Sequence, residues 1–247
     1  MELSTLLQYK PYSTARTEKR ALYAGLLTEL TQFHREHCPE YGRLLDALGC
    51  PAHMDCTVES TPMLPVSLFK ELELRSIPEG EVFKTITSSG TTGQRVSRIF
   101  LDGATSACQQ QALCQIMSDF LGERRLPFLV LDSRQVLRNR AMFSARGAGI
   151  LGFSIFGTRP CYALDEHMEL DLDGVRAFLE EHQGETIFLF GFTFIIWKHV
   201  VRALEERGER LDIPNGILVH GGGWKKLAGE AVSPGEFKAR VAAATGV

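Results

Sequence analysis

Apolar residues in the first sixty positions recur at helical spacing. Across 17–38 they stand three or four residues apart among charged residues, which predicts one amphipathic helix. Pro39 is expected to end it, because proline disfavours helical backbone in the residue before it. A second, shorter helix is predicted around 44–48, ahead of Gly49. We therefore expect residues 1–62 to form a helical segment that packs on the remainder.

From residue 63 onward, short apolar runs alternate with segments of helical spacing. A helical turn is expected at 66–71, and the last residues, 241–247, show no structural ending. Strands are predicted at 82–86, 96–101, 127–132, 152–156, 186–190 and 216–220, and the first two are expected to pair with each other. Helices are predicted at 113–121, 175–182 and 194–204, and a glycine follows each of them. This alternation predicts an α/β fold with a mainly parallel, helix-covered sheet, and we expect residues 63–247 to form it.

Composition and charge narrow the class of protein. The chain has 247 residues, and 27 Lys and Arg against 30 Asp and Glu give a net charge of −3, so no nucleic-acid partner is expected. Apolar runs are strand-sized, so no membrane span is expected, and the first residues lack the features of a signal peptide. The six cysteines do not form a disulfide framework, which favours reduced thiols and a cytoplasmic location. Six possible metal ligands occur within a short stretch: His34, His37, Cys38, Cys50, His53 and Cys56. Helical spacing would place His34 and Cys38 on one face as half of a site, but the close cysteine pairs of zinc sites are absent, so buried thiols and surface histidines are expected there and no metal site is predicted.

A loop of small residues follows the strand predicted at 82–86. It reads Thr87-Ser88-Ser89-Gly90-Thr91-Thr92-Gly93, seven small residues of which five carry hydroxyls. Glycine lets backbone N–H groups approach a ligand, and the hydroxyls add donors, so the loop predicts polyphosphate binding rather than a polar surface turn. It is not a P-loop, because Gln94 and Arg95 follow it where Lys and Ser or Thr are required.

A second glycine-rich segment closes the strand predicted at 216–220. His220 is followed by Gly221, Gly222 and Gly223, then by Trp224, Lys225 and Lys226. Bare backbone at the carboxyl end of a strand suits a flat ligand, since ligands of open α/β sheets bind at such ends. The alternative is a flexible turn beside a core tryptophan.

Taken together, these segments resemble the acyl-protein synthetase family. Its members are the fatty-acid-activating ligases of the bacterial luminescence fatty-acid reductase system, related to phenylacetate-CoA ligases within the adenylate-forming superfamily. The similar segments occur in the family's order at 64–70, 83–85, 87–93, 97–101, 143–149, 190–194 and 220–226. The resemblance implies the fold of the adenylate-forming enzyme N-terminal domain.

The resemblance also implies roles for individual residues. ATP phosphates, with Mg²⁺, would lie on Thr87 to Gly93, and adenine would lie on Gly221 to Gly223. His220 would orient the substrate carboxylate or be a core histidine, and Lys225 would meet the α-phosphate or be a surface charge. Trp224 would cover the base or fill the core. Phe192, Thr193 and Phe194 would form a wall for the acyl chain or belong to the core.

The implied activity is conversion of a fatty acid to acyl-AMP and transfer of the acyl group to a protein cysteine thiol. The alternatives are an aryl-acid or acyl-CoA ligase, or an inactive nucleotide-binding fragment. In the family the polypeptide continues beyond this point with further motifs, a mobile domain carrying a catalytic lysine, and the acyl-accepting cysteine, so the chain is expected to be an amino-terminal portion. A reductase partner for the acyl group is implied as well. Cys108, Cys114 and Cys161 are expected to be buried rather than acyl acceptors.

Overall fold

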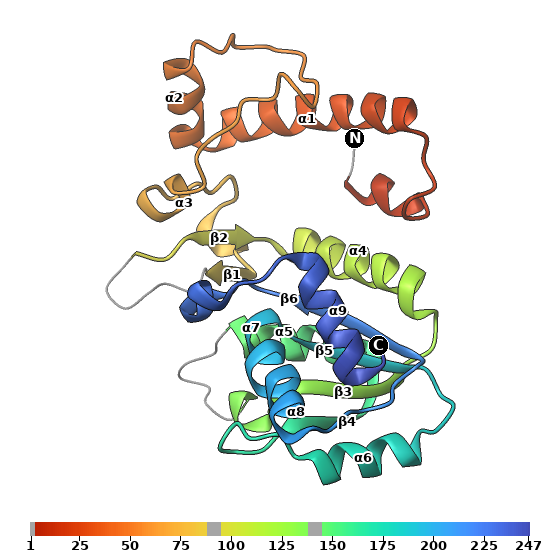
Figure 1. Ribbon diagram of the computed structural model, residues 1–247. Coiled ribbons are helices and arrows are strands. Elements are labelled where there is room, and N and C mark those ends of the chain that lie inside the picture. Colours follow the sequence, from red (N-terminus) through yellow and green to blue (C-terminus); the bar gives the residue numbers. More distant parts are fainter. Residues whose placement is uncertain (1–2, 88–94, 138–144) are drawn as a thin grey trace. The chain divides into compact units, whose positions relative to one another are not determined.

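The computed structural model describes residues 3–87, 95–137 and 145–247 (Figure 1). Within them the chain divides into two compact units, residues 1–120 and 121–247. The sequence predicts a domain boundary after residue 62, and that boundary stays a prediction. Across the described ranges, no helix is long and apolar enough to cross a membrane.

The first unit combines helices with a two-stranded hairpin. Its elements are η1 Leu3–Gln8, α1 Arg16–His37, α2 Pro39–Ala47, α3 Leu68–Glu71, η2 Glu79–Glu81, β1 Lys84–Thr87, β2 Arg98–Leu101 and α4 Gly103–Leu121. The strands β1 and β2 are antiparallel, with Lys84 opposite Leu101 and Thr87 opposite Arg98, which confirms the expected pairing. Pro39 ends α1 as expected and is also the first residue of α2, where its missing N–H costs nothing.

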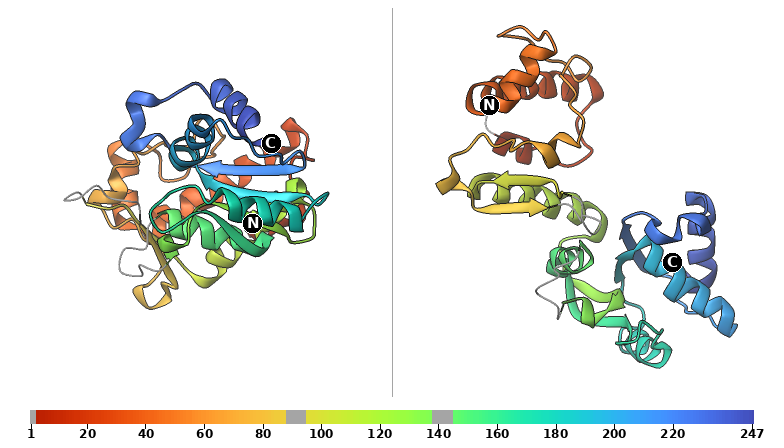
Figure 2. Two further views of the ribbon diagram at one scale, coloured as in Figure 1. Left: turned by 60° about the horizontal axis from the view of Figure 1, so that its bottom comes forward. Right: turned by 90° about the vertical axis from the view of Figure 1, so that its left-hand side faces the viewer.

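The second unit is a parallel sheet covered by helices. Its strands are β3 Leu126–Ser133, β4 Gly157–Leu164, β5 Ile187–Phe192 and β6 Gly216–Gly221, and its helical elements are η3 Arg134–Leu137, α5 Ala145–Phe153, η5 Ser154–Phe156, α6 Leu172–Glu181, α7 Thr193–Ile195, η6 Ile196–Val201, α8 Arg202–Arg207, η7 Lys225–Glu230 and α9 Pro234–Thr245. The strand order is β4-β3-β5-β6, and each neighbouring pair is parallel (Figure 2). The predicted α/β class is confirmed.

The two faces of this sheet are both apolar, as expected for strands that helices cover. On one face Leu129, Leu131 and Leu189 belong to a buried cluster that includes residues of α6, η6 and α9. On the other face Phe128 and Phe188 stack with ring centroids 4.9 Å apart. The faces alternate because successive side chains of a strand point in opposite directions.

One predicted strand is wrong. Residues 152–156, expected to be a strand, form the end of α5 and η5, and β4 begins only at Gly157. A side chain at Gly157 would force its surroundings to shift, because an added Cβ would lie 2.5 Å from the Cβ of Phe128. Glycine therefore lets the strand begin against a buried aromatic ring.

The final residues also differ from expectation. Residues 241–245 are the last part of α9 rather than a segment without a structural ending. The Ser233 hydroxyl accepts a hydrogen bond from the Glu236 backbone N–H at 3.1 Å, which caps the start of the helix. Gly246 ends it with a left-handed φ of +79°.

Candidate functional site

The carboxyl ends of the parallel strands lie at one edge of the second unit's sheet. In the register of β5 and β6, His220 lies opposite Gly191 and Gly221 lies opposite Phe192. Thr193 follows directly as the first residue of α7. The pairing therefore brings together residues that are 27 to 29 positions apart in the sequence. Both segments belong to the binding site that the sequence predicts.

The Thr193 hydroxyl is the centre of this edge. Its Oγ1 lies 3.0 Å from Nδ1 of His220, and 3.1 Å from each of the carbonyl oxygens of Gly221 and Gly222. The Thr193 residue is buried, with 8% of its surface exposed. Carbonyl oxygens only accept hydrogen bonds, so the single hydroxyl hydrogen is shared between them.

This arrangement selects one form of the His220 ring. Because the Thr193 hydrogen points to the carbonyls, its oxygen accepts a hydrogen bond from Nδ1–H of His220. The neutral ring then carries its lone pair on Nε2. Partial burial of the ring, together with the positive charge of Lys238, lowers the pKa of His220 below its usual value of 6.5, which favours this neutral form. One side of the ring packs against Phe237, with centroids 4.8 Å apart, while the residue as a whole remains exposed rather than being a core histidine.

The three glycines after His220 differ in what surrounds them. A Cβ added to Gly222 would lie 2.8 Å from Cδ1 of Phe192, and its φ is +77°, so this residue packs against the ring and requires glycine. At Gly221 and Gly223 an added Cβ would meet nothing within 4 Å. The backbone at these two positions borders open space, as a ligand lying against bare backbone requires.

The aromatic residues near this edge have separate surroundings. Gly149 of α5 lies so close that an added Cβ would be 3.2 Å from Cε2 of Phe192, whose half-buried ring thus lies between two glycine backbones. Phe194 is half-buried and packs against the core cluster. Trp224 also packs against that cluster, with its ring centroid 5.3 Å from that of Trp197 in an edge-to-face contact. The Lys225 side chain lies outside the described side chains.

The phosphate loop expected from the sequence is described only at its first residue. Thr87 ends β1 in the first unit. Ser88, Ser89, Gly90, Thr91, Thr92 and Gly93 lie outside the described residues. The joint binding of one nucleotide by this loop and by Gly221 to Gly223 stays a prediction.

A buried ion pair at the same sheet edge was not predicted. Asp132, fully buried near the end of β3, accepts hydrogen bonds from Nε of Arg146 at 2.8 Å and from its Nη2. Nη2 also contacts the sulfur of Met168, whose carbonyl accepts a hydrogen bond from Nδ1 of His199. The pKa of His199 is lowered mainly by burial of its ring, and the charges of Lys198 and Arg146 lower it further. One feature of the sequence indicates such a pair: Asp132 stands at the end of an apolar strand. A buried carboxylate is stable only when it has a charged or hydrogen-bonding partner.

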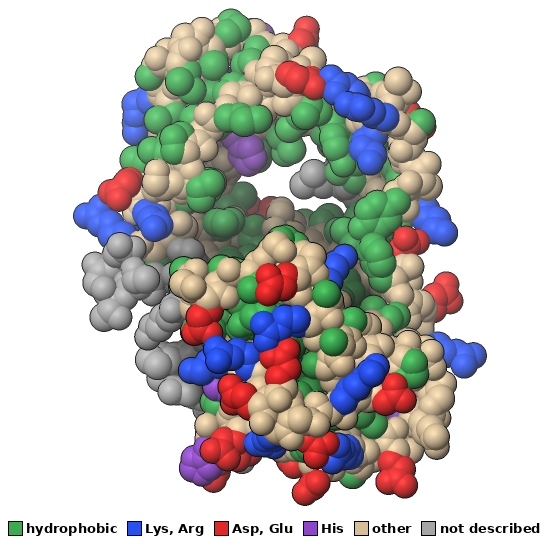
Figure 3. Space-filling view, viewed as in Figure 1, with side chains coloured by type: hydrophobic (Ala, Val, Ile, Leu, Met, Phe, Trp, Pro, Cys, Tyr) green, Lys and Arg blue, Asp and Glu red, His purple; other side chains and the backbone are tan. Residues whose placement is uncertain are grey.

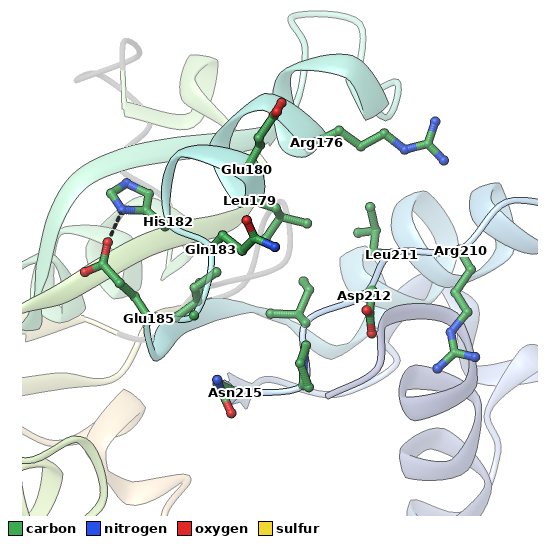
Figure 4. Close-up of a pocket in the computed structure, with 14 residues that line it drawn as sticks. Arg176, Leu179, Glu180, His182, Gln183, Glu185, Arg210, Leu211, Asp212 and Asn215 are labelled. Atoms are coloured by element: carbon green, nitrogen blue, oxygen red, sulfur yellow. Dashed lines mark hydrogen bonds and ion pairs between the residues drawn. The ribbon is translucent and has the colours of Figure 1, made fainter.

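A cavity of about 550 Å³ lies at the opposite edge of the sheet, at the amino ends of β5 and β6. Its lining includes Gln183, Arg210 and Asn215, and Figure 4 shows the hydrogen bond between His182 and Glu185 at one end of it, 2.8 Å long. Of the residues expected to bind substrate or cofactor, those that the structure describes do not line this cavity.

Among the cysteines considered as acyl acceptors, Cys161 is a poor thiolate. Burial raises the pKa of Cys161 to about 11, with a smaller contribution from the charge of Asp171. Cys108 and Cys114 are half-buried. Among the described residues, no three His, Cys, Asp or Glu side chains gather as a metal site.

The Asp132–Arg146 pair yields a stability prediction. Replacing Arg146→Met leaves a carboxylate buried without its partner, so the free energy of unfolding should fall by roughly 3–5 kcal/mol. The double variant Asp132→Leu with Arg146→Met removes both charges and should recover most of the loss. Urea unfolding measures both.

The matched control is Arg159→Met, which removes an exposed ion pair with Glu181 of 2.7 Å. It should change the unfolding free energy by no more than about 1 kcal/mol. Equal effects of Arg146→Met and Arg159→Met would show that the buried pair does not stabilise this edge.

The chain is similar to one protein family and to solved structures of one ligase. The family profile described as acyl-protein synthetase, LuxE, matches residues 2–247. Among solved structures, an open conformation of 2-hydroxyisobutyryl-CoA ligase in complex with 2-HIB-AMP and CoA matches with a TM-score of 0.61 and 15% identity, over 97% of this chain and 53% of that one. The same ligase in the thioesterification state matches with a TM-score of 0.62 and 18% identity, over 95% and 48%.

No curated protein sequence matches the chain. The chain spans about half the length of the solved ligases, and their likeness establishes its fold, that of the corresponding part of an adenylate-forming enzyme, as the resemblance implied. Because the family profile covers nearly every residue, this chain belongs to the acyl-protein synthetase (LuxE) family.

Proposed function

We propose that this chain carries the acid-activating part of an ATP-dependent acid–thiol ligase. A fatty acid becomes acyl-AMP, and its acyl group then passes to a protein cysteine thiol. Family membership supports the proposal, and so does the 2-HIB-AMP named in the complexes of the similar ligase. The observation that carries it is the open backbone of Gly221 and Gly223 beside the Thr193–His220 pair.

In this proposal adenine lies against Gly221 and Gly223. Trp224 supports the glycine segment from the core side, because its ring already packs against Trp197. Thr87 to Gly93 bind the β- and γ-phosphates with Mg²⁺, and Lys225 meets the α-phosphate. These cationic and N–H groups would neutralise the charge that builds up when two anions react.

The first half-reaction transfers AMP to the acid. A carboxylate oxygen of the fatty acid bonds to the α-phosphorus, the bond from that phosphorus to the bridging oxygen breaks, and pyrophosphate leaves. Rate in such a step comes mainly from placing the carboxylate in line with the leaving group. Phe192, fixed between Gly149 and Gly222, would be the wall that places the acyl chain, with Thr193 and Phe194 beside it.

The form of His220 gives it a role different from the one that resemblance suggested. Its neutral ring presents a lone pair on Nε2, which repels a carboxylate and accepts a hydrogen. We therefore assign Nε2 to the second half-reaction, where it takes the proton of the acceptor thiol. The sulfur then bonds to the acyl carbon, and AMP leaves with the electrons of the bond that breaks.

A CoA acceptor is the main alternative to a protein cysteine. It has support from the similar ligase, whose complexes contain CoA. If the family's protein acceptor applies, an acyl-CoA reductase type of partner would take the acyl group onward. Acyl transfer measured with CoA and with an acceptor protein separates the two.

Pyrophosphate exchange tests the proposed activation step. With ATP, Mg²⁺ and a panel of fatty and aryl acids, the gene's whole product should exchange labelled pyrophosphate with fatty acids. Gly223→Val should lower exchange roughly a hundredfold, because a side chain in the open space displaces the nucleotide.

The control is Gly229→Val, another position where an added Cβ meets nothing within 4 Å. It should leave exchange unchanged, and both variants should unfold like the native protein. Exchange by the whole product but not by this 247-residue chain would identify the chain as a nucleotide-binding part. Failure of every acid with the whole product would reject the ligase proposal.

The titration of His220 gives a separate prediction. Its pKa lies below 6.5, so acyl transfer should fall as the pH drops through that pKa and Nε2 gains a proton. Lys238→Gln removes a charge that lowers the pKa, so the midpoint should move to higher pH. NMR titration of the His220 ring and the acid limb of the transfer rate should shift together.

Lys198→Gln serves as the control, because that charge lowers the pKa of His199 instead. It should move the His199 resonance and leave the His220 midpoint in place. A transfer rate that is constant across the His220 midpoint would remove His220 from the proposed proton transfer.

A further inference from the structure

An apolar cavity of about 330 Å³ lies wholly within the first unit. One wall is η1 with the segment after it, the second is the beginning of α1, and the third is α4. Its apolar lining includes Leu6, Leu7, Tyr9, Leu22, Tyr23 and Ile116. The volume is at the lower end of the range of about 300–1,000 Å³ that is usual for small-molecule sites.

The wall formed by the start of the chain is held to α4 by specific contacts. The Gln115 side-chain amide donates a hydrogen bond of 2.7 Å to the carbonyl of Leu7. Tyr12 adopts a left-handed φ of 63°, which turns the chain back toward α1, and its ring meets Phe120 edge-to-face with centroids 5.8 Å apart. The cavity is therefore built by defined contacts rather than by a loose end of chain.

Exposed hydrophobic side chains surround the opening. Tyr9, Tyr12, Tyr23, Ile116 and Phe120 are all exposed. Figure 3 shows hydrophobic and basic side chains side by side on the first unit. A group of exposed apolar residues around a cavity marks a binding surface more often than scattered single residues do.

Two lysines supply positive charge at this cavity. Lys10 and Lys19 both line it. Lys19 is half-buried and makes no ion pair with a carboxylate of the described residues. Lys10 forms a long ion pair with Asp119, 4.0 Å between Nζ and Oδ1. An apolar interior beside the Lys19 ammonium group, which no described carboxylate neutralises, suits a ligand with an apolar body and an anionic end.

We propose that this cavity binds a linear aliphatic carboxylate. Its hydrocarbon chain lies among the leucine and tyrosine side chains, and its carboxylate meets Lys10 and Lys19. The lining of the cavity shares no residue with the proposed ligase site, and binding there does not depend on adenylation.

A displacement assay tests the class of ligand. Dansyl-labelled undecanoate is bound to the whole chain and displaced with octanoate, dodecanoate or hexadecanoate, and with dodecanol. Dodecanoate should displace the probe, and dodecanol should bind about tenfold more weakly because it lacks the charge-assisted contacts with the lysines. Equal affinity for dodecanol would overturn the assignment of a carboxylate.

Two variants test whether dodecanoate binds in this cavity. Ala112→Phe fills the cavity and Lys19→Gln removes a charge, and each should weaken dodecanoate binding about tenfold. The matched controls, Ala104→Phe on the same helix and Lys70→Gln, lie outside the lining and should bind normally. Should Ala112→Phe not fold, Lys19→Gln with its control decides the outcome.

One further variant separates this site from the proposed ligase site. Phe192→Ala changes the proposed acyl wall in the second unit and should leave dodecanoate binding at the first unit intact. Binding lost in Phe192→Ala but retained in Ala112→Phe would overturn the inference. A dimer that Ala112→Phe dissociates would also overturn it, because a second copy would then cover the cavity. If the unmutated whole product showed no pyrophosphate exchange with any acid but still bound dodecanoate, the ligase proposal alone would be rejected.

Discussion

The parallel pairing of β5 with β6 is the constraint on which the candidate site depends. In its register His220 faces Gly191 and Phe192 faces Gly221, so the chain that leaves β5 places Thr193 beside the glycine segment that leaves β6. A slip by one residue would turn every side chain of the strand to the opposite face and separate Thr193 from His220. The register therefore fixes both the tautomer of the histidine and the place where bare backbone meets open space.

Close packing around β5 holds this register. An added Cβ at Gly191 would lie 2.9 Å from the Cβ of Leu131, so the neighbouring strand approaches as closely as a glycine allows. On the other side, Gly149 of α5 contacts the rings of Phe190 and Phe192. The Arg146–Asp132 pair ties the first turn of that helix to β3. Each contact limits the movement of a wall of the site, which a reaction that depends on placing two anions in line requires.

Apolar patterning predicted much of the fold because β3, β5 and β6 each contain a continuous apolar run. The strand β4 escaped detection since its sequence contains Arg159 and Pro160, whereas the more apolar 152–156 precedes it. Within the described sheet β4 pairs only with β3, and an edge position tolerates a proline that cannot donate a hydrogen bond. A local pattern could not reveal that the aromatic run belongs to a helix packed on Phe188 and Phe190.

In the candidate site, too, some residues could be predicted from the sequence and others could not. Glycine-rich composition and strand ends pointed to Gly221, Gly223, Thr193 and His220, because these signals are local. Arg146 received no role from the sequence, since its partner Asp132 lies on another element and only tertiary packing joins them. The contact of Trp224 with Trp197 likewise depends on how β6 and η6 pack. The loop from Ser88 to Gly93 remains a prediction from composition and resemblance.

Amide NMR of the labelled chain during titration with a non-hydrolysable ATP analogue and Mg²⁺ is the most direct test of the nucleotide position. The account predicts that the largest shifts in the second unit occur at Gly221, Gly223 and Thr193, at the carboxyl edge of the sheet. Shifts confined to 210–215, at the amino-end cavity, would contradict it.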